Sequence, residues 1–448
     1  MALWFGEARL PGGWAKGVRI SLGGGLIASI VTDAPPESGD ERHAIALPGL
    51  PNLHSHAFQR GMAGLAERAG PSADSFWTWR EIMYRFVGRI GPDELRAIAA
   101  LAFMEMLEAG FTRVGEFHYL HHAPDGRAYA DPAAMAEAIA QAAEASGIAL
   151  TLLPVFYAHG GFGGAAPGDA QRRFVTDPDG FAALVAASRR TVAGLPDAVV
   201  GIAPHSLRAV TPDELAAILP IAESGPIHIH IAEQVREVED CLAWSGARPV
   251  EWLLDHAPVD GRWCLVHATH MREAETARLA ASGAAAGLCP ITEANLGDGL
   301  FPAPAFLAAG GAFGIGSDSN VRIDASEELR LLECGQRLSH RGRNLLARGG
   351  STGAALFAGA LAGGARALGA EAGIAVGRPA DLVSLDARHP SLLAREGDAL
   401  LDGWIFSAGR EAVDCVWRRG VRQVTGGRHI ARERIVADYA AALARLLA

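Results

Sequence analysis

The sequence is almost without lysine. Lys16 is the only lysine among 448 residues, and the remaining basic side chains are all arginine. Because alanine and glycine are also abundant, base composition of the genome is the simplest explanation for the bias. The scarcity nevertheless excludes any chemistry that requires a lysine after residue 16.

Paired cysteines, long apolar runs and excess positive charge are scarce as well. The five cysteines are scattered, without a CxxC pair, which favours a reduced, cytoplasmic protein. No stretch reaches the ~18 consecutive apolar residues that a membrane span needs. The start, "MALWFGEARLPGG", lacks the pattern of a signal peptide. A net charge of −10 argues against nucleic acid as a partner.

Apolar, β-rich runs alternate with alanine-rich amphipathic segments through most of the chain. The helical segments, such as 92–110 and 132–147, carry apolar residues at helical spacing and end at glycine. Eight strands are expected, at 44–53, 111–119, 148–157, 198–206, 225–233, 262–270, 284–292 and 312–320. Eight such strands with intervening helices predict a (β/α)₈, TIM-like barrel of the α/β class.

The sequence pattern at the two ends of the chain differs from that of the middle: short predicted strands are interrupted by glycine and proline. We expect residues 1–47 and 373–448 to form one small β-sandwich plus a final helix, and residues 48–372 to form the barrel. A glycine-rich segment, 159–169, is expected to be a mobile loop after the third strand.

Unusual polar residues fall where the predicted strands end, the edge at which barrels of this kind carry their active sites. They are His54 and His56 on the first strand, Tyr119 on the second, His205 and Arg208 at the fourth, His230 and Glu233 at the fifth, His267 on the sixth and Asp318 on the eighth. His54 and His56 point to the same side of their strand, because side chains alternate. With His230 and Asp318 they could hold one catalytic Zn²⁺.

Each feature alone also has an ordinary structural explanation. An isolated HxH pair is weak evidence, His267 could be a hydrogen-bonded core histidine, and Asp318 could cap a helix. His228 lies two residues before His230 and is an alternative ligand. The joint placement of such residues at the ends of four strands is what favours a metal site.

These residues together resemble the amidohydrolase superfamily, whose members join a metal-bearing barrel to a small sandwich built from both termini. Some members bridge two metal ions with a carboxylated lysine on the fourth strand. This chain has no lysine there, so it is similar to the mononuclear branch that includes the deaminases. Glu233, three residues after His230, is similar to the HxxE element of those deaminases.

A narrower resemblance covers the whole chain. The segments "PNLHSHAFQRGMAGLAE", "FWTWREIMYRF", "GEFHYLHH", "PHSLRAV", "HIHIAEQ" and "GSDSNVRIDASEELRLLE" resemble the formimidoylglutamate deiminases (N-formimino-L-glutamate iminohydrolases) of histidine breakdown. The resemblance implies a homodimer with one divalent metal ion per chain, bound by His54, His56, His230 and Asp318. It also implies that Glu233 and His267 act on the substrate, and that the rest of the substrate is held by Gln59, Arg80, Tyr119, His205 and Arg208.

The residue types suit that substrate. Its two carboxylates need planar, bidentate donors, and Arg80 and Arg208 are the candidates, although any single arginine could be a surface charge. Asp318 is expected to take a proton from water, Glu233 to protonate the departing nitrogen, and His267 to stabilise the intermediate. The alternatives are a deaminase of purine-like or triazine-like rings and, more remotely, a non-catalytic interaction protein. Zinc and iron would accept the same ligands.

Overall fold

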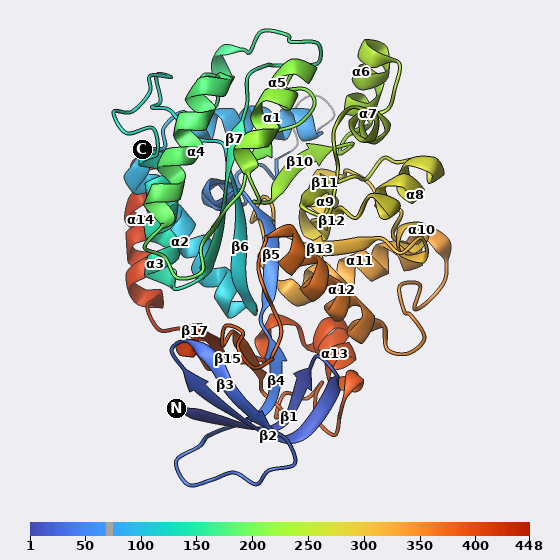
Figure 1. Ribbon diagram of the computed structural model, residues 1–448. Helices are drawn as coiled ribbons and strands as arrows, with labels where there is room; N and C mark the ends of the chain where they lie inside the picture. Colours follow the sequence, from blue (N-terminus) through green and yellow to red (C-terminus); the bar gives the residue numbers. More distant parts are fainter. Residues whose placement is uncertain (69–74) are drawn as a thin grey trace.

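The computed structural model describes residues 1–68 and 75–448, and its centre is a barrel of parallel strands (Figure 1). The barrel strands are β5 (Leu50–Ser55), β6 (Phe111–His118), β7 (Ala149–Phe156), β8 (Val199–Val200), β9 (Ala203–Pro204), β10 (Ile227–Ile231), β11 (Trp263–His267), β12 (Ala285–Leu288) and β13 (Ala312–Ile315). They are hydrogen-bonded in the order β10-β11-β12-β13-β5-β6-β7-β8, with β9 also on β7. Bridges from Ile202 to Ile227 and from Ser206 to His230 close the ring. The predicted (β/α)₈ barrel is therefore confirmed.

Two predicted strands are each divided in the structure. The run 44–53 turns at Gly49 into a strand of the terminal sheet and then β5, and a Cβ at Gly49 would lie 2.2 Å from the Thr112 side chain. The fourth barrel strand is interrupted at Gly201, where a Cβ would lie 2.3 Å from the Pro226 carbonyl oxygen. At both places the backbone approaches a neighbour more closely than a side chain allows.

Helices surround the barrel, and the two predicted from periodicity are present. They are α2 (Pro92–Glu108), which begins with proline at its first turn, and α3 (Ala134–Ser146), which ends at left-handed Gly147. The other helices are α1 (Phe76–Val87), α4 (Pro178–Val192), α5 (Pro212–Ile218), α6 (Val235–Ser245), α7 (Pro249–His256), α8 (Glu273–Ser282), α9 (Pro290–Leu296), α10 (Ala303–Ala308), α11 (Ala325–His340), α12 (Thr352–Ala367), α13 (Asp398–Gly403) and α14 (Arg432–Leu447).

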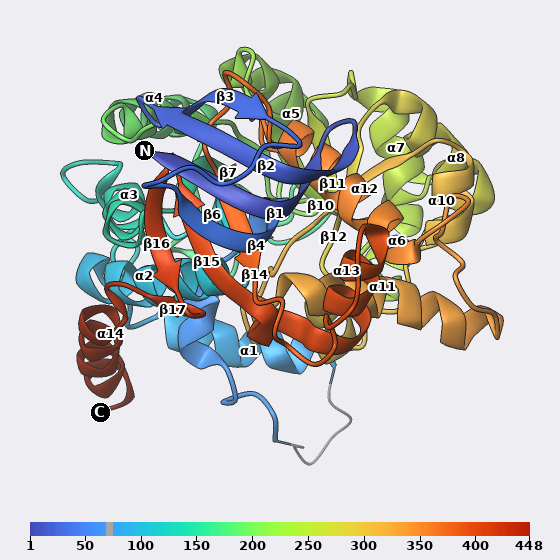
Figure 2. The same ribbon diagram turned by 90° about the horizontal axis from the view of Figure 1, so that it is seen from below.

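Strands from both ends of the chain form a second sheet that covers the bottom of the barrel (Figure 2). Its order is β17-β16-β15-β14-β4-β1-β2-β3. The bounds are β1 (Ala2–Leu10), β2 (Gly13–Gly23), β3 (Leu26–Val31), β4 (Glu41–Pro48), β14 (Leu382–Leu385), β15 (Val413–Arg418), β16 (Val421–Thr425) and β17 (Arg428–His429). A bridge from Leu26 to Pro379 curls this terminal sheet around its own apolar core, which includes Phe5, Ile20 and Trp417. The predicted sandwich thus takes the form of one curled sheet.

The terminal sheet and the barrel are joined in two ways. β4 continues into β5 with only Gly49 between them, as Figure 1 shows. A buried ionic network also crosses the boundary. Arg113 on β6 contacts Asp197 at 3.1 Å, and Arg418 on β15 contacts both Asp197 and, at 2.7 Å, Asp381. The two guanidinium groups are buried and the two carboxylates half-buried, and each charge has an opposite partner.

The glycine-rich segment 159–169 lies beside the barrel mouth and contacts two helices. The His159 ring contacts Glu214 at 2.8 Å, and the Gly160 amide donates to the carbonyl of Ala165. Phe162 stacks on Trp244 of α6 with ring centroids 5.5 Å apart. These contacts tie the predicted mobile loop to α5 and α6.

Within the described residues, no helix has the length and apolar character to cross a membrane.

Candidate active site

The chain order of the barrel explains why His54, His56 and Asp318 meet. β5 and β13 are neighbours, so the segment after β13 pairs with the end of β5. The Asp318 amide donates to the His54 carbonyl at 3.0 Å, and the His56 amide donates to the Asp318 carbonyl at 2.9 Å. Strand pairing alone therefore brings two imidazoles and a carboxylate to one point of the barrel mouth.

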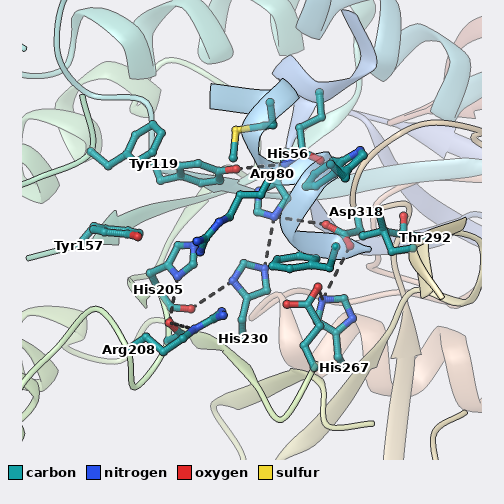
Figure 3. Close-up of a pocket in the computed structure, with 18 of the residues that line it drawn as sticks. His56, Arg80, Tyr119, Tyr157, His205, Arg208, His230, His267, Thr292 and Asp318 are labelled. Carbon is teal, nitrogen blue, oxygen red and sulfur yellow. Dashed lines mark hydrogen bonds and ion pairs between the residues drawn. The ribbon is translucent and has the colours of Figure 1, made fainter. Parts of the chain in front are cut away.

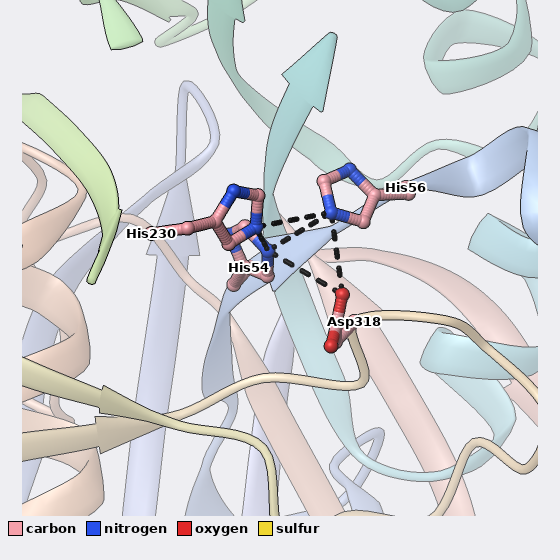
Figure 4. A group of neighbouring side chains, drawn as sticks. All are labelled: His54, His56, His230 and Asp318. Atoms are coloured by element: carbon pink, nitrogen blue, oxygen red, sulfur yellow. Dashed lines mark hydrogen bonds and ion pairs between the residues drawn. The ribbon is translucent and has the colours of Figure 1, made fainter. Parts of the chain in front are cut away.

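Four side chains at this point form a cluster with the dimensions of a metal site (Figure 4). The Nε2 atoms of His54, His56 and His230 lie 3.0–3.3 Å apart, and Oδ1 of Asp318 lies 3.5 Å and 3.3 Å from the first two. All four atoms are within 4.8 Å of one another. An ion with bonds of about 2.0–2.1 Å in a tetrahedral site would separate its ligands by about 3.3 Å. The cluster therefore fits one small divalent cation.

The hydrogen bonds of the imidazoles point to the same conclusion. Nδ1 of His56 donates to the carbonyl of Phe117 at 3.0 Å, and Nδ1 of His230 donates to the carbonyl of His205 at 3.1 Å. A neutral ring that donates from Nδ1 carries its lone pair on Nε2, so these lone pairs converge on the centre of the cluster. Both lone pairs are thus directed to the place where a cation would be bound.

Burial keeps the three histidines in the form that binds metal. It lowers the pKa of His54 to about 4 and that of His56 to about 3, and it lowers the pKa of His230 as well. Burial alone would raise the pKa of Asp318, but the hydrogen bond from His54 and the nearby imidazoles lower it below its usual range. At neutral pH the cluster thus offers three neutral imidazoles and a carboxylate.

The alternative ligand His228 is turned away from this cluster. Its Nε2 donates to the carbonyl of Ala367, the last residue of α12, at 2.7 Å. His228 and His230 lie two residues apart on β10, so the two alternatives share a face of the strand in the extended pattern. The structure separates them through the hydrogen-bond partner that each ring finds.

His267 lies next to the cluster between three carboxyl groups. Its Nε2 is 3.8 Å from both Glu233 and Asp318, and its Nδ1 is 3.2 Å from Glu293 on α9. Burial would lower its pKa, but Glu233, Glu293 and Asp318 together raise the pKa of His267 to about 10. Sequence reasoning did not include Glu293, although its position five residues after the seventh barrel strand, β12, is a signal that could have found it.

A cavity opens above the cluster (Figure 3). Of the eleven residues expected from the sequence, all but the fully buried His54 line it, and aromatic side chains of Phe76, Tyr84, Tyr157 and Phe174 complete the walls. In Figure 3, Arg80 and Arg208 lie on the side of His205, opposite Asp318 and His267.

The two arginines of the cavity lack a protein counter-charge at close range. Among the described residues, no carboxylate lies within ion-pair distance of Arg80 or Arg208, and the buried Nη1 of Arg208 has no hydrogen-bond partner there. Tyr119 lies close by, and its hydroxyl accepts a hydrogen bond from Gln59 at 3.1 Å. Because burial raises the pKa of Tyr119, the hydroxyl keeps its proton and can donate to an anion. This end of the cavity is therefore built to receive negative charge.

Trp77, one of the aromatic residues that flank Arg80 in the sequence, lies among three arginines. Its indole ring faces the guanidinium of Arg80 at 4.5 Å, that of Arg236 at 4.8 Å and that of Arg208 at 6.0 Å. An indole face attracts cations, so three like charges can approach one another around it.

Substitution of Trp77 by leucine is expected to raise KM about 10-fold and to leave kcat nearly unchanged, because cation–π contacts of about 1–2 kcal/mol are lost at the anion-binding end only. Trp77→Phe should have a KM between those of the wild type and of Trp77→Leu. Steady-state kinetics checks this, with Trp14→Leu in the terminal sheet as the matched control. A fall in kcat with constant KM would contradict the assignment.

Several residues at the barrel mouth adopt a backbone conformation that side chains disfavour. Ala232, His267, Ala268, Asp318 and Asn320 all have positive φ angles, between 44° and 67°. Non-glycine residues in this region are strained and persist where the surrounding structure holds them. Because strained backbone of this kind gathers at functional sites, these five residues around the cluster indicate that function requires their conformation.

Comparison with known proteins agrees with the geometry. The sequence profile described as "Amidohydrolase family" matches residues 45–422, and that described as "Formimidoylglutamate deiminase HutF, N-terminal domain" matches residues 2–44. A formimidoylglutamate deiminase from Pseudomonas aeruginosa is 51% identical over 100% of this chain and 99% of its own length. A 5-methylthioadenosine/S-adenosylhomocysteine deaminase from Natronomonas pharaonis is 30% identical over 82% of this chain and 79% of its own.

Solved structures show the same architecture. The crystal structure of an amidohydrolase from Brucella melitensis is 58% identical, covers 100% of both chains and superposes with a TM-score of 0.97. A zinc-bound adenosine deaminase from Xanthomonas campestris is 24% identical, covers 99% of this chain and 98% of its own, and has a TM-score of 0.82, which shows a shared fold. By sequence and by fold, the chain belongs to the amidohydrolase family, in the group of the formimidoylglutamate deiminases.

Proposed function

We propose that this protein hydrolyses N-formimino-L-glutamate to N-formyl-L-glutamate and ammonia. One observation carries the proposal: a single cavity has a cluster that fits a metal ion at one end and two arginines without carboxylate partners at the other. A dicarboxylate with a formimino head has matching chemistry at both ends. The full-length similarity to the Pseudomonas aeruginosa deiminase supports the same substrate.

We propose His54, His56, His230 and Asp318 as the ligands of one divalent ion per chain, most simply Zn²⁺. When bound, such an ion supplies Lewis-acid chemistry and makes water nucleophilic at neutral pH. Asp318 is placed to accept a proton from the attacking water, whose oxygen bonds to the formimino carbon. Glu233 gives a proton to the terminal nitrogen, the bond from carbon to that nitrogen breaks, and ammonia leaves a formyl group behind.

Glu233 and His267 suit these roles by their surroundings. Burial raises the pKa of Glu233 to about 7, against the lowering influence of His267 and Arg208, so the carboxyl can hold or release a proton near neutral pH. His267 carries positive charge 3.8 Å from both Glu233 and Asp318. A cation in that place stabilises negative charge that develops on the reacting carbon's oxygen.

Arg80 and Arg208 are proposed to bind the two substrate carboxylates, with Gln59, Tyr119 and His205 donating further hydrogen bonds. Bidentate guanidinium–carboxylate contacts combine charge with a fixed geometry. The absence of competing carboxylates among the described residues leaves both guanidinium groups free for a ligand.

Arg208→Met is expected to lower kcat/KM by roughly 2–5 kcal/mol, because one carboxylate would be buried without its partner. The measurement is the ammonia-release rate over a range of substrate concentrations. Arg190→Met, on the outer helix α4, is a suitable control. Unchanged kinetics in both Arg80→Met and Arg208→Met would show that other residues hold the carboxylates.

The direct test of the function is incubation with N-formimino-L-glutamate and measurement of ammonia. A second candidate is a deaminase of purine-like or triazine-like rings, which the aromatic walls of the cavity and the relative from Natronomonas pharaonis favour. A parallel screen of purines, triazines and other amidines separates the two. Ammonia release from a ring but not from formiminoglutamate would overturn the proposal. A protein without metal and without any turnover would indicate a non-catalytic interaction role.

The assembly and location of the protein are part of the same proposal. The five cysteines are free thiols and four of them are buried, which supports a reduced cytoplasmic setting. A homodimer is expected from the family resemblance, and light scattering on the purified protein tests it. Neither a nucleic acid nor a membrane is needed for the reaction.

A further inference from the structure

One fully buried carboxylate near the active site has no part in the chemistry described above. Glu237 lies in the first turn of α6, four residues after Glu233, and its side chain is 0% exposed. Its Oε1 accepts a hydrogen bond from the Ala232 amide at 3.1 Å, and its Oε2 accepts one from the Glu233 amide at 3.2 Å. Each oxygen of this carboxylate thus binds one amide of the segment that carries Glu233.

That segment needs such support. β10 ends at Ile231, and the next residue, Ala232, has a φ of 51°, a left-handed conformation that alanine disfavours. Beyond the strand end, the amides of Ala232 and Glu233 bind Glu237 in place of a neighbouring strand. A carboxylate that accepts two backbone N–H groups holds the turn in a conformation which its sequence alone would not keep.

Glu237 also carries negative charge toward the anion-binding end of the cavity. Burial would lower the pKa of Arg208, but the charges of Glu237 and Glu233 outweigh it and raise that pKa. Glu237 does not line the cavity and is not one of the four residues of the metal-fitting cluster. Glu237 can therefore act on the reaction through the turn that it holds and through its charge near Arg208, and the first of these routes is the direct contact.

We propose that Glu237 is a positioning residue for Glu233, and that its two backbone hydrogen bonds place the Glu233 carboxyl at the reacting nitrogen. The inference rests on the proposed deimination, in which Glu233 moves the proton. Misplacement of a catalytic group by about 1 Å can cost on the order of 10²-fold in rate. Loss of the Glu237 carboxylate should therefore act on kcat through Glu233 and leave the metal in place.

The variant that tests this is Glu237→Gln, which keeps the shape but replaces one acceptor by an amide NH₂ that cannot accept. We expect kcat for N-formimino-L-glutamate to fall on the order of 10- to 100-fold, with unchanged metal content. Glu237→Asp keeps the charge but is too short to reach both amides, and it should show a smaller loss of kcat; it also serves if the glutamine variant folds poorly. Glu239→Gln, an exposed glutamate on the same helix with the same change of charge, should match the wild type.

A double-mutant cycle with Glu233→Gln distinguishes positioning from a general structural defect. If Glu237 acts through Glu233, adding Glu237→Gln to Glu233→Gln should cost less than about 2-fold further in kcat, because the group being placed is already lost. Losses that multiply in the double variant, or a fall in metal content with Glu237→Gln, would overturn the proposal. A wild-type enzyme that fails to release ammonia from formiminoglutamate would instead refute the proposed function, so the two failures are distinguishable.

Discussion

Asp318→Ala is expected to lower kcat/KM by about 10⁴-fold or more and to reduce the metal content of the purified protein well below one ion per chain. Asp318 contributes one corner of the cluster, and it is also the carboxylate placed to take a proton from water. Its loss therefore removes a metal ligand and a general base together. Each of these two contributions is worth about 10²–10⁴-fold in rate. Elemental analysis and ammonia release, measured on the same samples, check both parts of the expectation.

His56→Ala should behave in the same way, because Nε2 of His56 lies in the same cluster. Asp213→Ala, on the exposed first turn of α5, is the matched control and should keep both metal and activity. Removal of the metal with a chelator and its return should abolish and then restore turnover. Two tightly bound ions per active chain would contradict the mononuclear site.

Glu233→Gln is expected to remove most of kcat, on the order of 10²–10⁴-fold, with metal binding intact, and the wild type should form ammonia rather than formamide. After water adds, the reacting carbon holds two nitrogens, and the protonated one departs. Glu233 lies beside His267 at the end of the cavity where the metal cluster is. The glutamate nitrogen would lie nearer Arg80 and Arg208, which oppose further positive charge there.

Product analysis by NMR decides the direction of cleavage. N-formyl-L-glutamate in amounts equal to ammonia is the expected result, and Glu239→Gln, which changes a glutamate on the solvent side of α6, provides the control for the substitution. Formamide and free glutamate as main products would overturn both the substrate orientation and the role given to Glu233.

The elements that the sequence predicts well are those with a local signature. Alternation along the segment that contains β5 is enough to predict that His54 and His56 share a face, and periodicity is enough to find α2 and α3. The division at Gly49 could not be predicted, since it depends on which sheet each half of the run 44–53 pairs with. β4 pairs with β1 and β14, and β5 pairs with β6 and β13. These partners lie outside the window of a local pattern.

Within the site, the residue types were predictable and their orientation was not. His228 and His230 look alike in the sequence, and only the Ala367 carbonyl on α12 separates them. Glu237 has the spacing of an ordinary helix residue, so its hydrogen bonds to the turn appear only in three dimensions. Trp77 likewise becomes informative only when arginines from three separate segments are seen around its ring.

The direct passage from β4 into β5 makes the terminal sheet inseparable from the active site. His54 lies on the strand whose beginning is fixed, across one glycine, by the pairing of β4 with β1 and β14. The network of Arg113, Asp197, Arg418 and Asp381 fastens the neighbouring strand β6 to the same sheet. The terminal sheet is thus not a removable module. A truncation or domain fusion that cuts the chain near residue 48 would separate β5 from the terminal sheet that fixes its start. We expect the first measurable effect to be loss of bound metal, because His54 lies on β5.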